Sequence, residues 1–363
     1  MLNYHNVLSE LIADFPQQDR FDLNIKHIPT LKNIVYYSVP DTEPTEGFIR
    51  WSELEEMAES KDYAQLATIK CSPGDIGNIQ FTSGTTGMPK AASLTHYNIV
   101  NNAKSLTEHI NLFQNLYNSS TITANVLPLY HIFGFVAGSL TGALNRQTNV
   151  YPAPGFSAEH SIKSIEKRSC TMLIGTPTMF TDILHHPSRV NHDMSSLNLA
   201  LVGGAPATPA MVMTAKAEFN CRVGVGYGMT ENSCATFITP PGLPDDLVTS
   251  TVGLPIPGVD AKVIDPETEE TLPEGEIGEL CTRGFVIFKG YVGDEAKTRE
   301  SFTNDGEWFK TGDLAIIKDG ITKITGRSKD MIIRGGENIQ PTEIENEICR
   351  FGPVQVINTF SNF

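Results

Sequence analysis

The stretch LNLALVGGAPATPAMVMTAKAEFNCRVGV, residues 197–225, holds two short apolar runs with a helical segment between them. The runs Leu197–Val202 and Cys221–Val225 have the length and composition of buried strands. Between them, Thr208 followed by Pro209 has the order of an N-cap residue and a first helical residue. A helix that connects two buried strands predicts parallel pairing, because the chain must cross back over the sheet before the second strand begins.

The same alternation extends over residues 70–245 and predicts an α/β region with a parallel sheet and crossover helices. In residues 97–113, apolar side chains recur every three or four positions, which predicts an amphipathic helix. The other elements expected here are strands at Ile76–Thr82, Asn125–Leu129 and Thr171–Gly175, a helix capped by Ser157, and a helix after Pro177.

Residues 250–326 change to a β-rich pattern, in which Asp319-Gly320 predicts a tight hairpin. The strands expected there are Ala261–Ile264, Gly278–Arg283, Val286–Tyr291, Leu314–Ile317 and Ile321–Thr325. We therefore expect one domain over residues 1–326, and a hinge with the beginning of a small α+β domain over residues 327–363.

The two ends of the chain carry weaker patterns. Before residue 70, we expect a strand within Asn33–Val39 and an acidic helix near Trp51–Ser60, with Ser52 as its cap. After residue 327, we expect a strand at Met331–Arg334, a Gly-Gly turn and a helix from about Pro341.

Composition excludes several classes of protein. The 363 residues are 40% hydrophobic, which excludes wholesale disorder, and the net charge of -15 argues against a dedicated nucleic-acid-binding protein. The six cysteines form no C-x-x-C pair, which favours a reducing compartment. Residues Val126–Leu144 carry no charged side chain, but a proline and three glycines favour a buried strand, a loop and a small-residue helix over a membrane span.

The segment FTSGTTGMPK, residues 81–90, combines hydroxyls, glycines and a lysine directly after a predicted strand. The glycines allow successive backbone N–H groups to converge, so that the segment suits the oxygens of a polyphosphate. It differs from the P-loop pattern, because Pro89 precedes the lysine and no Ser or Thr follows it. Its candidate phosphate-binding residues are Thr82, Ser83, Gly84, Thr85, Thr86, Gly87 and Lys90.

This segment resembles the phosphate loop of the adenylate-forming, or AMP-binding, superfamily, which includes acyl- and aryl-CoA synthetases and peptide-synthetase adenylation domains. Four more segments resemble its motifs in the same order: LPLYHIFG (127–134), GYGMTEN (226–232), KTGDLA (310–315) and GRSKDMIIRGGENIQPTEIE (326–345). Within the superfamily, NIQFTSGTTG, SLTHYNIVNN and SKDMIIRGGENI are similar to the medium-chain acyl-CoA synthetases. The resemblance implies an adenylate-forming N-terminal domain, with parallel sheets, crossover helices and a β-rich subdomain.

Two carboxylates stand out without the family. Glu231 follows a strand end and a Gly-Tyr-Gly turn, where a carboxylate can hold Mg²⁺, and Thr230 beside it can donate to an α-phosphate. Asp313, in a Thr-Gly-Asp turn, offers two acceptors to a ribose diol. An ordinary surface glutamate and a turn-capping aspartate are the alternatives for these two residues.

The resemblance assigns roles to more residues. It implies nucleotide binding by the phosphate loop together with Gly203, Gly204, Ala205, Tyr227, Gly228, Thr230, Asp313 and Arg327. It implies catalytic roles for Lys90, His131, Thr230 and Glu231, a hinge at Lys329, and a CoA tunnel at Gly335, Gly336 and Glu337. It also implies room for an alkyl chain near Gly134 and residues 137–142. Packing at strand ends, a buried core histidine and a charged linker are the competing interpretations for Tyr227, His131 and Arg327.

We therefore expect an ATP-dependent fatty acid–CoA ligase of the acid–thiol ligase class (EC 6.2.1 type), with ATP, Mg²⁺ and CoA, and without nucleic acid or a transmembrane segment. The alternatives are another carboxylate-adenylating enzyme, such as an aryl-CoA ligase or adenylation domain, and a nucleotide-binding remnant without catalysis. Most of the family's N-terminal region and its last lysine-containing motif have no counterpart here, so we expect a fragment or truncated form with reduced activity. The resemblance implies a mitochondrial location, with any transit segment outside this chain, and the cytoplasm is the alternative.

Overall fold

The computed structural model describes residues 7–8, 10, 12, 18–37, 47–59, 68, 70–82, 89–111, 117–240, 242–328, 332–334, 337–339, 344 and 348. The chain forms two units, residues 1–71 and 72–363. The first unit contains β1 (Val35–Tyr36), the parallel strand β2 (Ile49–Arg50), and α2 (Trp51–Glu59). Its small core contains Ile12, Leu23, Ile25 and Phe48.

The start of α2 differs from the prediction. Ser52 is the second residue of the helix rather than its cap, so that prediction is wrong. Glu53 instead accepts the backbone N–H of Arg50 through Oε2 at 3.1 Å, which is one half of a capping box. Arg20 forms an ion pair with the same carboxylate at 2.8 Å, so a contact distant in sequence helps to fix where the helix begins.

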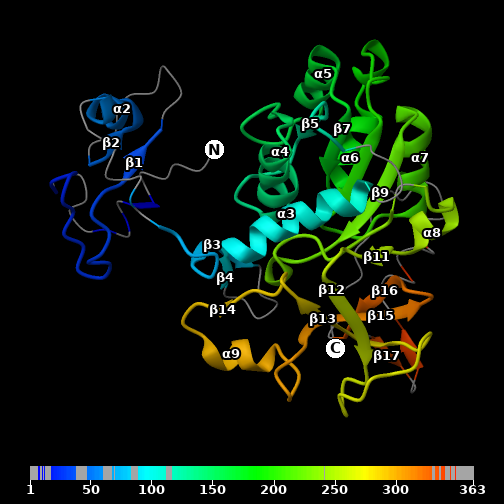
Figure 1. Cartoon of the computed structure of the whole chain (residues 1–363). Coiled ribbons are helices and arrows are strands. Elements are labelled where there is room, and N and C mark those ends of the chain that lie inside the picture. Colours follow the sequence, from blue (N-terminus) through cyan, green and yellow to red (C-terminus); the bar gives the residue numbers. More distant parts are fainter. Residues whose placement is uncertain are drawn as a thin grey trace. The chain divides into compact units, whose positions relative to one another are not determined.

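Within the described residues, the second unit is built on a seven-stranded sheet (Figure 1). Its strands lie in the order β11 (Leu254–Pro255), β10 (Phe237–Ile238), β9 (Arg222–Tyr227), β8 (Leu199–Gly203), β7 (Met172–Gly175), β5 (Ile122–Asn125) and β6 (Thr148–Val150). The strands from β9 to β6 are parallel, which confirms the predicted parallel sheet, and β10 and β11 extend it in antiparallel fashion.

Helices cover both faces of this sheet (Figure 1). Leu173 and Ala200 pack against the helices of one face, whereas their strand neighbours Met172 and Leu199 pack against those of the other. This alternation follows from the two-residue period of a strand. The first face carries α5 (Ala158–Arg168), α6 (Pro177–His185) and α7 (Pro209–Phe219), and the second carries α3 (His96–Asn111) and the π-helix η3 (Phe133–Leu140).

The predicted strand Asn125–Leu129 is wrong in position, because β5 ends at Asn125. Val126 and Leu127 continue to be buried, but their burial does not come from strand pairing. Pro128 has no N–H to donate to a neighbouring strand, so an extension of the ladder would lose a hydrogen bond there. The apolar run therefore predicted burial correctly, but it did not predict the residue at which the strand ends.

The small-residue helix predicted after this strand is present as η3, followed by α4 (Thr141–Leu144). Asn125 Nδ2 donates to the carbonyl of Gly134 at 3.0 Å, and a Cβ at Gly138 would lie 2.1 Å from that nitrogen. A Cβ at Gly142 would lie 2.3 Å from the side chain of Asn149. These glycines allow the asparagine side chains to pack closely against the helices, and the room for an alkyl chain expected nearby remains a prediction. Among the described residues, no helix is long and apolar enough to cross a membrane.

Smaller sheets complete the second unit. One contains β14 (Gly290–Tyr291), β4 (Lys90–Thr95) and β3 (Ile76–Thr82), and another contains β12 (Val259–Ile264), β13 (Gly278–Gly284), β15 (Phe309–Lys318) and β16 (Ile321–Arg327). β17 (Ile332–Arg334) pairs with β18 (Glu337–Ile339). The short helices are η4 (Arg189–Asn191), η5 (Thr230–Asn232), α8 (Asp245–Ser250) and α9 (Glu295–Glu300).

The predicted hairpin between β15 and β16 is confirmed. Asp319 and Gly320 have φ angles of 52° and 75°, as a turn with both central residues in the left-handed region requires. The predicted strand Val286–Tyr291 is wrong over most of its length, because only Gly290–Tyr291 pairs as a strand. The helix predicted from about Pro341 lies largely outside the described residues.

A stripe of buried polar side chains on α3 ties loops of the second unit to this helix. Each member binds a backbone carbonyl, and the carbonyls belong to segments far away in the sequence. Asn98 Nδ2 donates to Phe285 (2.6 Å) and Ile287 (2.9 Å), Asn102 Nδ2 to Asn232 (3.3 Å) and Ala235 (2.7 Å), Ser105 Oγ to Pro257 (2.6 Å), and His109 Nε2 to Ile238 (2.9 Å). A carbonyl only accepts, so His109 carries its proton on Nε2.

The N-cap predicted at Ser157 is confirmed, since its side chain accepts the backbone N–H of His160 at 3.3 Å. We expect Ser157→Ala to lower the free energy of unfolding by about 1 kcal/mol, because the first turn of α5 then loses its side-chain acceptor. Urea denaturation followed by circular dichroism measures this change. Ser157→Asp, which keeps an acceptor, should restore most of the stability, and equal losses for both variants would contradict the capping role.

Candidate functional site

The carboxyl ends of the neighbouring strands β8 and β9 form one edge of the predicted site. Gly203 pairs with Gly226, and a Cβ at Gly203 would lie 3.0 Å from the carbonyl oxygen of Gly226. Gly204 turns the chain with a φ of 79°, and the ring of Phe133 lies against both Gly203 and Gly204. Ala205 follows in an exposed position. This edge is where open α/β sheets bind their ligands.

The segment after β9 folds back on itself and carries Glu231 into the interior. A Cβ at Gly228 would lie only 1.6 Å from the carbonyl oxygen of Cys234, so a side chain there would collide with the backbone. The turn that follows forms η5, in which Thr230 is half-buried and Glu231 is 6% exposed. The alternative that Glu231 is an ordinary surface glutamate is therefore wrong, because its side chain is buried.

Glu231 and Lys90 both contact Tyr291, one at its hydroxyl and the other over its ring. The hydroxyl of Tyr291 donates to Oε1 of Glu231 at 2.7 Å, and the ammonium of Lys90 lies 5.0 Å from the centre of the Tyr291 ring. Burial, and then the charge of Glu231, raise the pKa of Tyr291, so its hydroxyl remains a donor. Among the described residues, Lys90 forms no ion pair, so its charge is available to an anion.

Asp313 and Tyr227 form a second cluster. The Tyr227 hydroxyl donates to Oδ2 of Asp313 at 2.6 Å, and Arg327 Nε donates to Oδ1 at 3.0 Å. Asp313 is 7% exposed, whereas the Arg327 side chain is 60% exposed. Burial and the neighbouring Asp313 raise the pKa of Tyr227, which keeps its hydroxyl protonated. Tyr227 and Glu231 belong to the same short segment. This segment therefore contributes one residue to the cluster around Asp313 and one to the group around Tyr291.

Several predicted residues lie outside the described part of the chain. These are Ser83, Gly84, Thr85, Thr86 and Gly87 of the phosphate loop, the hinge Lys329, and Gly335 and Gly336 of the expected CoA tunnel. The residues that border the loop are described: Thr82 and Lys90 are paired at the ends of β3 and β4. Glu337 is the first residue of β18, where it pairs with Arg334. The roles assigned to all of these residues remain predictions.

His131 is exposed, so its interpretation as a buried core histidine is wrong. Its Nδ1 accepts the backbone N–H of Phe133 at 3.2 Å, which places the histidine at the start of η3. Because Phe133 contacts Gly203 and Gly204, the His131 segment borders the edge of the sheet where these glycines lie. In the described part of the chain, no three His, Cys, Asp or Glu side chains are grouped closely enough to hold a metal ion.

The sequence did not identify Tyr291, Asn98 or Asn102 as residues of the site. Tyr291 lies 60 residues from Glu231 along the chain, and Asn102 lies 133 residues from Ala235. Contacts across such separations leave no local pattern. A weak sign was present for α3, where Asn98, Asn102, Ser105 and His109 recur at helical spacing beside the apolar stripe.

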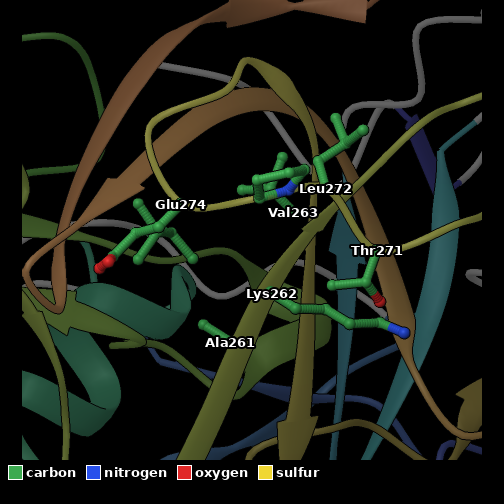
Figure 2. Close-up of a pocket in the computed structure, with 8 residues that line it drawn as sticks. Ala261, Lys262, Val263, Thr271, Leu272 and Glu274 are labelled. Carbon is green, nitrogen blue, oxygen red and sulfur yellow. The ribbon is translucent and has the colours of Figure 1, made fainter.

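A hollow of about 190 Å³ lies between β12, residues 271–274 and Ile317 (Figure 2). Figure 2 shows Val263 and Leu272 close together, with the Glu274 carboxylate directed away from the Lys262 amine. None of its lining residues is a predicted site residue. Charge and hydrogen bonding therefore locate the candidate site better than the shape of this hollow does.

The fold defines the class of protein. The chain has the fold of adenylate-forming enzymes, and it belongs to the AMP-binding enzyme family, whose profile matches residues 22–292. The predicted membership of this superfamily is thereby confirmed.

Two similar proteins are CoA ligases by name, and a third is an ATP-bound protein, MatB. The mitochondrial medium-chain acyl-CoA ligase ACSF2 of Danio rerio is 39% identical over 350 residues, which cover 94% of this chain and 56% of that protein. The crystal structure of ATP-bound MatB from Rhodopseudomonas palustris is 32% identical, with a TM-score of 0.73 over 83% of this chain and 59% of that chain. The anthranilate CoA ligase AuaEII in complex with anthranoyl-AMP is 25% identical, with a TM-score of 0.79 over 92% of this chain and 61% of that chain. The chain thus spans a little over half the length of these relatives.

Proposed function

We propose that the protein containing this chain is an ATP-dependent fatty acid–CoA ligase that forms an acyl-AMP intermediate and then acyl-CoA. The observation that supports it most directly is the arrangement of Lys90 and Glu231 around Tyr291, at one end of the strand pair that borders the phosphate loop. The names of the relatives support a CoA ligase as the class of enzyme. The name of ACSF2 also supports a medium-chain fatty acid as the substrate and the mitochondrion as the location.

In this proposal, Lys90 binds the β- and γ-phosphates of ATP. A lysine without a carboxylate partner among the described residues is suited to this role, because it need not first give up an ion pair. The loop residues 82–87 add hydroxyls and backbone N–H groups around the same phosphates. Thr230, beside Glu231, donates to the α-phosphate. His131 borders the acyl end of the site.

Glu231 is proposed as the protein's ligand for Mg²⁺. Tyr291 occupies Oε1, and among the described residues nothing donates a hydrogen bond to Oε2. A single carboxylate fits Mg²⁺, which in nucleotide sites is held by one or two carboxylates together with the substrate phosphates. When bound, the ion neutralises phosphate charge. Glu231 therefore suits an ion that arrives with ATP.

Asp313 is proposed to accept hydrogen bonds from the ribose hydroxyls. Tyr227 and Arg327 each hold one of its oxygens, so the carboxylate is oriented before the nucleotide binds. The resemblance to the family supports a place for Gly203, Gly204, Ala205 and Gly228 beside the adenine.

The proposed reaction has two steps. A carboxylate oxygen of the fatty acid attacks the α-phosphorus of ATP, an O–P bond forms, and the bond to pyrophosphate breaks. The CoA thiol then loses its proton and attacks the acyl carbon, so that a C–S bond forms and the C–O bond to AMP breaks. Lys329 is proposed as the hinge between the steps, and Gly335, Gly336 and Glu337 as part of the CoA path.

The second candidate is a ligase for an aromatic carboxylate. The TM-score of 0.79 with the anthranilate CoA ligase, over 92% of this chain, supports this alternative on backbone geometry. The sequence identities point the other way, at 39% for the medium-chain ligase and 25% for the anthranilate ligase. We therefore retain the fatty acid as the proposed substrate.

The test combines ATP binding with exchange of labelled pyrophosphate into ATP, using the whole protein that contains this chain and acids from acetate to palmitate beside benzoate and anthranilate. We expect ATP binding, and exchange that depends most strongly on medium-chain acids.

Lys90→Ala should weaken ATP binding by on the order of 10–150-fold, because a charge-assisted hydrogen bond contributes about 1.5–3 kcal/mol.

Lys104→Ala is the matched control, since Lys104 is exposed on α3 and has the same charge. Exchange that requires an aromatic acid would support the second candidate. ATP binding without exchange for any acid would favour a non-catalytic nucleotide-binding protein, and no ATP binding at all would contradict every form of the proposal.

A further inference from the structure

Tyr291 contacts both of the oppositely charged side chains that the proposed function uses. Its hydroxyl donates to Glu231 at 2.7 Å, and its ring centre lies 5.0 Å from Nζ of Lys90. The side chain is 8% exposed, so these contacts occur in a site largely shielded from water. None of the motifs discussed above assigns a role to this tyrosine.

The strand register explains why Tyr291 meets Lys90. Tyr291 lies opposite Ala92 in the pair formed by β14 and β4. Lys90 lies two residues from Ala92, on the same face of β4, so it is the diagonal neighbour of Tyr291 across the two strands. Diagonal neighbours are within reach of aromatic and long side chains, and lysine over tyrosine is such a pair.

Neighbouring residues hold the Tyr291 ring in place. Its backbone N–H donates to Oγ1 of Thr298 at 2.9 Å, and the ring of Phe288 meets it edge-on with centres 4.9 Å apart. Phe288 in turn donates its backbone N–H to the carbonyl of Glu231 at 2.8 Å. The tyrosine and the glutamate are thus fixed to each other through both side chain and backbone.

We propose that Tyr291 is a positioning residue that keeps Lys90 and Glu231 from neutralising each other before the nucleotide binds. Its hydroxyl orients the carboxylate, and its ring holds the ammonium on another side of the same residue. Two opposite charges that paired directly would attract each other strongly in a partly buried site, and neither would then be free for its ligand. This inference rests on the roles proposed above for Lys90 and Glu231.

The first test separates the hydroxyl from the ring. Tyr291→Phe keeps the ring under Lys90 but removes the donor to Glu231. We expect the Mg²⁺ concentration needed for half-maximal ATP binding to rise about 10-fold, as for loss of an outer residue that orients a metal ligand. ATP binding without Mg²⁺ should stay unchanged. Tyr117→Phe, which removes another buried tyrosine hydroxyl, is the control and should change neither quantity.

The second test removes the ring as well. Tyr291→Leu should weaken Mg²⁺-free ATP binding on the order of 10-fold, because Lys90 can then pair with Glu231. Adding Glu231→Gln to this variant removes the competing charge and should restore the binding. A merely structural role predicts no such rescue, since a second substitution in the same site would not repair a folding defect.

The outcomes distinguish this inference from the proposed function. If Glu231→Gln alone leaves the Mg²⁺ requirement unchanged, the metal role proposed for Glu231 fails. If Glu231→Gln raises the requirement but Tyr291→Phe does not, the positioning role of the hydroxyl is overturned. If Tyr291→Leu is folded and still binds Mg²⁺-free ATP normally, the separation of charges by the ring is overturned. A chain that binds no ATP would overturn both.

Discussion

Glu231→Gln is expected to lower acid-dependent pyrophosphate exchange by on the order of 100-fold or more, while leaving the fold intact. The loss should exceed the roughly 10–100-fold typical of residues that act through a metal ligand, because the substitution removes the proposed ligand charge itself. Glutamine retains an oxygen that can accept the hydroxyl of Tyr291, so the packing around residue 231 should persist. The Mg²⁺ concentration needed for half-maximal ATP binding should rise in parallel.

Titrations of ATP at several Mg²⁺ concentrations, together with the exchange assay, measure both effects. Glu108→Gln is the matched control, because Glu108 is an exposed glutamate on α3. Its exchange rate and Mg²⁺ requirement should equal those of the unsubstituted chain. A Glu231→Gln variant with normal exchange and a normal Mg²⁺ requirement would show that this buried carboxylate has another purpose.

Asn102→Ala is expected to lower the free energy of unfolding of the second unit by about 2–4 kcal/mol. Asn102 is fully buried; its Nδ2 donates to the carbonyls of Asn232 and Ala235, and its Oδ1 accepts the N–H of Ala235 at 3.2 Å. Alanine leaves these buried backbone groups without their partner, and each such group costs about 1–3 kcal/mol, with incomplete additivity. Because Asn232 follows Glu231, ATP binding in Mg²⁺ should also weaken.

Urea denaturation measured by circular dichroism gives the change in stability, and titration gives the change in ATP affinity. Asn101→Ala is the matched control, since Asn101 is the adjacent residue of the same helix and, among the described residues, its side chain bonds only to the carbonyl of Tyr97, within α3. It should change the stability by less than about 0.5 kcal/mol, as is usual for surface substitutions. Equal effects of the two substitutions would contradict the role assigned to the buried stripe.

Much of the fold followed from local patterns. The cap at Ser157, the cap and proline at Thr208 and Pro209, and the Asp319-Gly320 hairpin were all predicted and are present. These features depend on residues within a few positions of one another. One of the errors lies where a distant group contributes to the outcome. The start of α2 involves an ion pair between Arg20 and Glu53.

The site divides in a similar way. The motifs identified Lys90, Glu231 and Asp313 as carriers of charge, but they did not indicate which side chains contact these three residues. For Glu231 and Lys90 this side chain is Tyr291. Both partners of Asp313, Tyr227 and Arg327, belong to motifs, but only as nucleotide-binding residues and not as donors to its carboxylate.

The sequence by itself determined the alternation of strands and helices, the positions of most turns and caps, and the identity of the charged residues, because these depend on short-range patterns of polarity and backbone preference. Only the tertiary structure decided which of them meet. Tyr291 reaches Lys90 and Glu231 because β14 pairs with β4 in one register, and Asn102 reaches the segment after Glu231 because α3 packs on one face of the sheet. Such contacts arise from burial and pairing across more than fifty residues of chain, and no local stretch of sequence encodes them.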